Sequence, residues 1–99
     1  MGLKIRIPRA EIEDFCQRNR ISKLALFGSV LRDDFSTDSD VDMLVEFEPG
    51  TKVGLNFFAL EEELSELLGY KVDLNTPGFL GKYFRDRIMA EAESLYDAA

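Results

Sequence analysis

The stretch from Lys23 to Glu48, KLALFGSVLRDDFSTDSDVDMLVEFE, decides the fold of this 99-residue chain. Its opening residues 23–27 (KLALF), apolar after Lys23, predict a short buried strand that stops at Gly28. Apolar and acidic residues then alternate over residues 41–48, which predicts a second strand with one buried face. Only twelve residues, 29–40, separate the two strands, too few for a comfortable parallel crossover. We therefore expect an antiparallel pair joined by a short helical turn.

Three helices are predicted around these strands. The first runs from Pro8 to about Arg20, with three apolar residues on one face: Ile12, Phe15 and Cys16. The second spans about 55–68, ends at a capping Gly69 and has an apolar stripe: Phe57, Leu60, Leu64, Leu67 and Leu68. Its other side is expected to be a solvated face: Glu61, Glu62, Glu63 and Glu66. The last helix begins near Leu80 and carries apolar residues at helical spacing: Phe84, Ile88, Ala92 and Leu95.

A third strand is predicted over residues 70–75, directly after the second helix. The second strand, this helix and the third strand form a strand–helix–strand unit, which makes the two strands parallel. The sequence therefore predicts a mixed β-sheet with helices packed on it, of the α/β (α+β) class. A length of 99 residues predicts a single domain over residues 1–99.

Composition excludes several classes of function. With 12 basic and 19 acidic residues, the net charge of −7 disfavours general nucleic-acid binding, which needs a basic face. Histidine is absent, so a Ser-His-Asp triad and an HExxH zinc site are excluded. The single cysteine, Cys16, forms no internal disulfide and is expected in the core. Without an apolar run of membrane-spanning length or a signal peptide, a reduced, cytoplasmic protein that does not associate with membranes is expected.

Three aspartates predict a cation site. Asp40 and Asp42 stand two residues apart at the start of the second strand, a spacing that turns both carboxylates to one face. Asp73 lies between apolar residues on what is expected to be the adjacent strand, where an acid is costly unless it is paired or binds a metal. Together the three could hold one or two Mg²⁺ ions, an arrangement used for in-line phosphoryl or nucleotidyl transfer.

The turn after the first strand predicts a phosphate site. Gly28 allows the backbone to approach a phosphate, Ser29 adds a hydroxyl donor, and Arg32 lies three residues farther on. Taken alone, each feature has a simpler interpretation. The Gly-Ser pair could be a plain turn, the Asp40/Asp42 pair a capped loop or a solvated strand edge, and Arg32 part of a surface ion pair. Their occurrence together with the aspartates, in the order that the topology requires, favours a functional site.

These segments also carry a family resemblance. Residues 26–32 (LFGSVLR), 39–45 (SDVDMLV) and 72–74 (VDL) resemble the motifs of the polymerase-beta-type nucleotidyltransferase superfamily, and within it the minimal nucleotidyltransferases (MNT proteins) of bacteria and archaea. The resemblance covers nearly the whole chain. It implies a polymerase-beta-like nucleotidyltransferase fold, with a nucleoside triphosphate as substrate and Mg²⁺ as cofactor.

The resemblance also implies roles for individual residues. Asp40 and Asp42 would hold the metal ions that bridge the triphosphate, and Asp73 would bind the catalytic metal and help to deprotonate the acceptor. Gly28 and Ser29 would bind the β- and γ-phosphates, and Arg32 would assist them. One departure is visible, because residues 31–33 read Leu-Arg-Asp where the family often has Ala-Arg-Gly.

The short chain leaves no segment for a separate acceptor-binding domain, so another protein is expected to bring the acceptor. MNT proteins resemble antitoxins that act with HEPN-type ribonuclease toxins, and the leading hypothesis is an antitoxin that transfers AMP from ATP to a hydroxyl of such a toxin. The alternative is a non-catalytic module that neutralises its partner by complex formation. Transfer to a small-molecule hydroxyl is a weaker third hypothesis. The apolar residues of the last helix could mark a toxin interface or a homo-oligomer.

Overall fold

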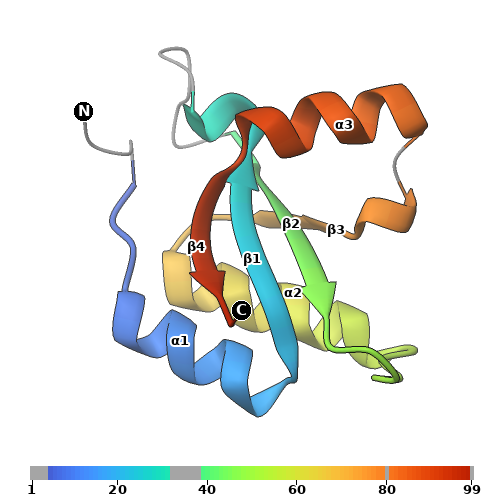
Figure 1. The fold of residues 1–99 in the computed structure, drawn as a ribbon. Coiled ribbons are helices and arrows are strands. Elements are labelled where there is room, and N and C mark those ends of the chain that lie inside the picture. Colours follow the sequence, from blue (N-terminus) through green and yellow to red (C-terminus); the bar gives the residue numbers. More distant parts are fainter. Residues whose placement is uncertain (1–4, 32–38, 80, 99) are drawn as a thin grey trace.

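The computed structural model describes residues 5–31, 39–79 and 81–98. Within them, four strands form one sheet in the order β3-β2-β1-β4, with three α-helices packed on it (Figure 1). The mixed α+β architecture expected from the sequence is confirmed. In chain order the elements are α1 (Arg9–Arg18), β1 (Ile21–Phe27), the 3-10 turn η1 (Gly28–Leu31), β2 (Val41–Phe47), α2 (Asn56–Leu68), β3 (Val72–Asn75), the 3-10 turn η2 (Pro77–Phe79), α3 (Lys82–Glu91) and β4 (Glu93–Asp97).

The β1–β2 pair is antiparallel, as its short connection predicts. Ile21 lies opposite Phe47 at one end of the pair, and Phe27 lies opposite Asp42 at the other. The helical turn expected after Gly28 is η1. This pairing brings the end of β1 and the start of β2 to the same end of the sheet.

The β2–β3 pair is parallel, with α2 as the crossover. Val41 pairs with Val72, and Asp42 pairs with Asp73. Helix α2 ends as predicted at Gly69, whose φ of 77° is the left-handed conformation that glycine adopts most easily, and the Gly69 N–H donates to the Ser65 carbonyl oxygen. The strand that carries the third aspartate is therefore placed beside the strand that carries the first two.

The chain after Glu91 differs from the prediction. The last helix stops there, because Ala92 has an extended backbone with φ −64° and ψ 141°. Residues 93–97 then form β4, which pairs antiparallel with β1 and sets Ser94 opposite Ala25. The prediction that Leu95 continues the helix was therefore wrong. Pairing with β1 satisfies backbone groups along an edge that would otherwise be open, and this gain outweighs the helical spacing of the apolar residues.

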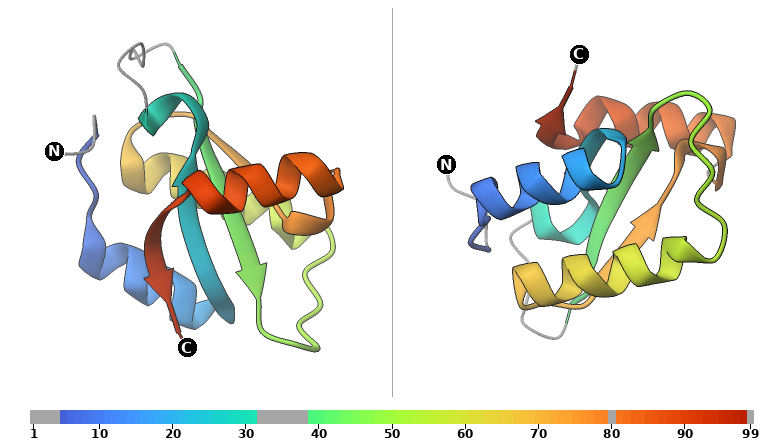
Figure 2. Two further views of the ribbon diagram at one scale, coloured as in Figure 1. Left: turned by 45° about the horizontal axis from the view of Figure 1, so that its top comes forward. Right: turned by 90° about the horizontal axis from the view of Figure 1, so that it is seen from below.

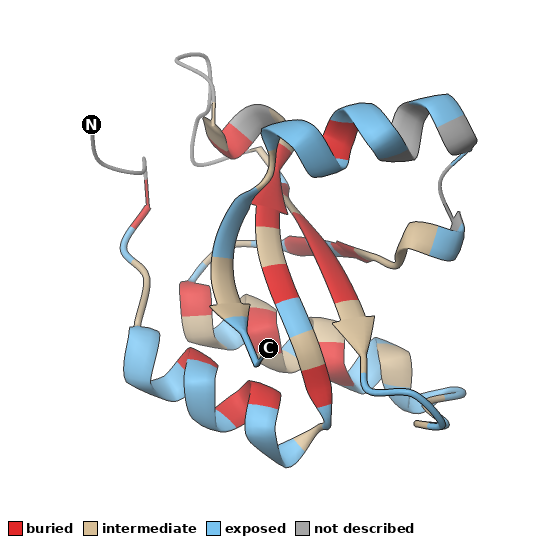
Figure 3. Cartoon of the chain, in the orientation of Figure 1, coloured by how far each residue is buried: buried red, intermediate tan, exposed pale blue. Residues whose placement is uncertain are grey.

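Helices lie on both faces of the sheet (Figure 2), and each face has a cluster of buried apolar residues (Figure 3). Helices α1 and α2 cover one face, where the predicted core residues are buried: Ile12, Phe15, Cys16, Leu60, Leu64 and Leu68. Helix α3 lies on the second face and packs Ile88 against Phe27 and Leu44. This smaller cluster leaves part of the second face uncovered. No helix among the described residues has the length and apolar character that a membrane span needs.

The predicted solvated face of α2 is only partly solvated. Glu62 and Glu66 are exposed, as expected. Glu63, in contrast, accepts a 2.8 Å hydrogen bond from the Arg18 guanidinium, which connects α2 to α1. Glu61 is half-buried, and its Oε2 accepts a 2.8 Å hydrogen bond from the Leu74 N–H. Two of the four glutamates therefore bind other elements, contacts that depend on helix placement and that periodicity does not reveal.

Candidate active site at the β1–β2–β3 end of the sheet

The structure sets Asp42 and Asp73 side by side. They are register partners on neighbouring parallel strands, whose backbones are about 4.8 Å apart. Their chain neighbours Val41, Val72 and Leu74 are buried in the core under α1 and α2. Because side chains alternate along a strand, both aspartates face the opposite side of the sheet. Two carboxylates from different strands thus share one face, which is the arrangement that a shared cation requires.

The three predicted carboxylates differ in exposure. Asp42 is half-buried, whereas Asp73 and Asp40 are exposed. Asp40 directly precedes β2 and lies two residues before Asp42. All three acids therefore lie at one end of the sheet, and solvent or a ligand can reach them.

Gly28 lies against the carboxylate of Asp42. Its φ is +76°, and a Cβ built at this position would overlap Asp42 Oδ2. A side chain is therefore excluded both by backbone conformation and by the acid. The turn η1 that starts here, Gly28–Leu31, packs against β2, the strand that carries Asp42. The placement of the Ser29 side chain and all of Arg32 lie outside the described residues, so their predicted contacts stay predictions.

The donors present fit a hard divalent cation such as Mg²⁺. Carboxylate oxygens are its preferred protein ligands. Within residues 5–31, 39–79 and 81–98, no three His, Cys, Asp or Glu side chains converge on a ready-made metal site. Mg²⁺ in nucleotide-processing sites is held by one or two carboxylates together with substrate phosphates, so a complete protein cage is not needed. Asp42 and Asp73, with Asp40 beside them, would be the protein's share of such a set.

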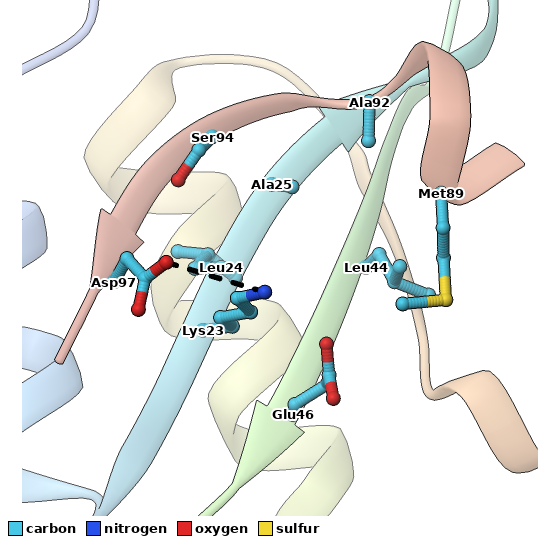
Figure 4. A pocket seen from close by; sticks show the side chains of 9 residues that line it. All are labelled: Lys23, Leu24, Ala25, Leu44, Glu46, Met89, Ala92, Ser94 and Asp97. Carbon is cyan, nitrogen blue, oxygen red and sulfur yellow. Dashed lines mark ion pairs between the residues drawn. The ribbon is translucent and has the colours of Figure 1, made fainter. Parts of the chain in front are cut away.

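A hollow of about 130 Å³ lies farther along the second face of the sheet (Figure 4). Its lining includes Ala25 and Leu44 of the sheet and Met89 of α3. At its polar end Lys23 Nζ lies 4.0 Å from Asp97 Oδ2. Leu44 is the next residue after Asp42 on this face, so the hollow and the carboxylates are neighbours, although none of the three aspartates lines it. The sequence did not indicate this hollow, because β4 forms one of its walls.

A protein-family model covers most of the chain. The nucleotidyltransferase domain model matches residues 9–95. The chain belongs to the nucleotidyltransferase domain family. The family resemblance drawn from the three sequence motifs is thereby confirmed, and the match includes every predicted site residue.

Two relatives carry protein adenylyltransferase names. MJ0128 of Methanocaldococcus jannaschii, provisionally named a protein adenylyltransferase, is 45% identical over 62 residues, 63% of this chain and 62% of that protein. Protein adenylyltransferase MntA of Thermococcus cleftensis is 42% identical over 65 residues, 66% of this chain and 65% of MntA. The chain thus spans less than two thirds of the length of each.

Solved structures confirm the fold. A provisionally named minimal nucleotidyltransferase superposes with a TM-score of 0.71 and 34% identity, covering 85% of each chain. A toxin–antitoxin crystal structure with AMP-PNP has a chain that superposes with a TM-score of 0.73, covering 92% of this chain and 74% of that one. Its identity of 19% makes this second match informative about fold alone. The predicted minimal nucleotidyltransferase fold is confirmed.

Proposed function

We propose that this protein is a Mg²⁺-dependent nucleotidyltransferase that moves AMP from ATP to a hydroxyl of a partner protein. The observation that carries the proposal is the pairing of Asp42 with Asp73 on one face, directly beside Gly28. The protein adenylyltransferase names of the relatives support AMP as the transferred group and a protein as the acceptor. Asp40 would complete the acidic set.

The chemistry follows from charge. The hydroxyl oxygen of the acceptor attacks the α-phosphorus of ATP in line, and the bond to the bridging oxygen breaks, so that pyrophosphate leaves. Bound Mg²⁺ would neutralise the triphosphate, which a protein of net charge −7 would otherwise repel. The chain has no histidine, and we assign the proton of the hydroxyl to the carboxylate of Asp73, which is exposed and lies beside Asp42. Positioning and charge neutralisation supply most of the acceleration in phosphoryl transfer.

The partner we propose is a HEPN-type ribonuclease toxin, with this protein as its antitoxin. The similarity to protein adenylyltransferase MntA supports this role, because a solved toxin–antitoxin complex pairs a protein named MntA with HepT. The uncovered part of the second face offers an approach to the carboxylates for a protein that carries the acceptor hydroxyl. We further propose that the protein acts in the cytoplasm, where ATP and Mg²⁺ are abundant.

The test is co-expression with the product of the adjacent gene, purification of both proteins, and intact-mass measurement of the partner with and without Mg-ATP. We expect the partner to gain the mass of AMP only when both metal and nucleotide are present. Asp42→Asn and Asp73→Asn should each lower the transfer rate at least about a hundredfold, because metal-centred charge stabilisation contributes several kcal/mol. Glu62→Gln and Glu66→Gln are matched controls, since both acids are exposed on α2.

Two outcomes would contradict the proposal. A partner that never gains AMP would exclude protein adenylylation. Toxin neutralisation that is unchanged by Asp42→Asn and Asp73→Asn would instead identify a module that acts by complex formation alone. Thermal melting gives an independent measurement: ATP with Mg²⁺ should raise the melting temperature more than either alone, because a ligand bound only by the folded state stabilises it.

A further inference from the structure

Strand β3 is an edge strand, but the outward-pointing backbone amides on either side of Asp73 are hydrogen-bonded. The sheet order β3-β2-β1-β4 leaves β3 with one strand neighbour, β2. Every second N–H of an edge strand points away from the sheet and lacks a strand partner. In β3 these outward donors are the amides of Val72 and Leu74, the two residues that flank Asp73.

Helix α2 supplies acceptors for both amides. The Val72 N–H donates to Ser65 Oγ at 2.9 Å, and the Leu74 N–H donates to Glu61 Oε2 at 2.8 Å. Glu61 and Ser65 are four residues apart, so both lie on the same face of the helix, and their spacing matches two alternate amides of a strand. The helix thus replaces the missing fifth strand at this edge.

The Ser65 hydroxyl is fixed in its acceptor role. Its own proton is donated to the Glu61 carbonyl oxygen at 2.9 Å, which directs an oxygen lone pair toward Val72. Glu61 therefore contributes twice, by its backbone carbonyl to Ser65 and by its carboxylate to Leu74. Removal of either side chain would leave a part-buried amide of β3 without this partner.

We propose that Glu61 and Ser65 are positioning residues that hold β3 so that Asp73 stays in register with Asp42. The inference rests on the proposed function, in which Asp73 binds the metal and receives the proton. The side chain of Asp73 is exposed, so packing does not fix it, and its place depends on the backbone on either side. Both flanking amides are bound by α2, so the helix side chains set the position of the acid without touching substrate.

The experiment compares Glu61→Ala, Glu61→Gln and Ser65→Ala with the control Glu66→Ala, which removes an exposed acid from the same helix. Transfer rates are measured below the melting temperature of every variant, as functions of ATP and of Mg²⁺. Glu61→Ala is expected to lower kcat by about tenfold to a hundredfold, the range for small displacements of reacting groups. It should also raise the Mg²⁺ concentration for half-maximal activity, while the KM for ATP at saturating Mg²⁺ changes less.

Comparison of Glu61→Gln with Glu61→Ala separates the positioning role of Glu61 from the effect of its charge. Glu61→Gln keeps a carbonyl oxygen that accepts from Leu74, and it should recover most of the kcat lost in Glu61→Ala. Ser65→Ala should lower kcat in the same direction. Glu66→Ala should match the unmodified protein. A Glu61→Gln variant as impaired as Glu61→Ala would overturn the proposal in favour of a charge effect. Variants that melt earlier but keep kcat and Mg²⁺ dependence would overturn it in favour of a purely structural role.

A second readout does not depend on catalysis. Amide hydrogen exchange should accelerate at Leu74 in Glu61→Ala and at Val72 in Ser65→Ala. Mn²⁺ titration followed by line broadening of the Asp42 and Asp73 amide signals should show weaker binding in both variants. If the unmodified protein binds Mn²⁺ and the variants bind it more weakly, but no AMP is transferred, the proposed function is refuted and the positioning role is supported. An active protein whose variants bind Mn²⁺ normally would refute the positioning role alone.

Discussion

Two glycines with nearly the same positive φ angle allow the energetic cost of the contact between Gly28 and Asp42 to be measured. Gly28 has φ +76° and Gly69 has φ +77°, but their surroundings differ. A methyl group on Gly28 would overlap the Asp42 carboxylate, whereas one on Gly69 would meet no atom within 4 Å. Gly69→Ala therefore reports the cost of a left-handed backbone alone, and Gly28→Ala adds the cost of displacing the acid.

The magnitudes follow from this comparison. A left-handed non-glycine residue costs about 1–2 kcal/mol. For a domain of this size each kcal/mol corresponds to about 4–8 °C in melting temperature, so Gly69→Ala should melt about 5–15 °C lower. In Gly28→Ala the carboxylate must also leave its preferred rotamer, which adds about 0.5–1.5 kcal/mol. Gly28→Ala should also abolish most of the proposed transfer activity, whereas Gly69→Ala should retain it when both are measured below their melting temperatures.

The assay is a double-mutant cycle in urea with Asp42→Ala as the second change. When the carboxylate is absent, Gly28→Ala should cost the same free energy of unfolding as Gly69→Ala, because only the backbone term remains. An excess that persists in the Asp42→Ala background would show that another neighbour opposes the methyl group. A Gly28→Ala variant no less stable than Gly69→Ala would refute the contact, and with it the assignment of the turn as one wall of the site.

Four further measurements test the packing and the surface ion pairs. Leu64→Ala should lower the free energy of unfolding by about 2–5 kcal/mol in urea, because its side chain is fully buried under the sheet. Burial raises the pKa of the Cys16 thiol from its ordinary value near 9 to about 12, so a thiol reagent at pH 8 should react with Cys16 only after unfolding. Since the thiol of the unfolded chain ionises first, the free energy of unfolding should fall as the pH rises above about 9. Arg18→Met should hardly change the urea midpoint, although Arg18 bridges Asp14 and Glu63, because these ion pairs are exposed to solvent.

The parts of the fold that the sequence predicted are those with strong local signals. The alternation over residues 41–48 identified β2, which ends at Phe47, and Gly69 marked the end of α2. The short connection after Gly28 was enough to predict the antiparallel β1–β2 pair. The placement of Asp73 beside Asp42 followed from the strand–helix–strand rule, because a parallel crossover leaves few choices of neighbour.

The parts that the sequence did not predict depend on contacts between distant segments. Residues 93–97 continue a helical pattern of apolar residues, and only the open edge of β1 makes them a strand. Leu44 lies among the acids of β2, on the face expected to be polar, and is buried because Ile88 of α3 covers it. In the sequence Glu61 is one of several glutamates on a helix face predicted to be solvated, and nothing there indicates that it accepts a hydrogen bond from the Leu74 N–H. Each of these features requires knowledge of which element lies next to which.

The parallel pairing of β2 with β3 also has a consequence for the order in which the protein folds. Asp42 and Asp73 become neighbours only after the intervening loop and α2 have docked, whereas β1 and β2 meet through a much shorter connection. Because distant pairings close more slowly than local ones, the hairpin should gain protection first and the β3 amides last. A newly synthesised molecule would then contain the β1–β2 hairpin before the proposed nucleotide site is complete. Pulse-labelling with deuterium during refolding would reveal this order, and simultaneous protection of all four strands would contradict it.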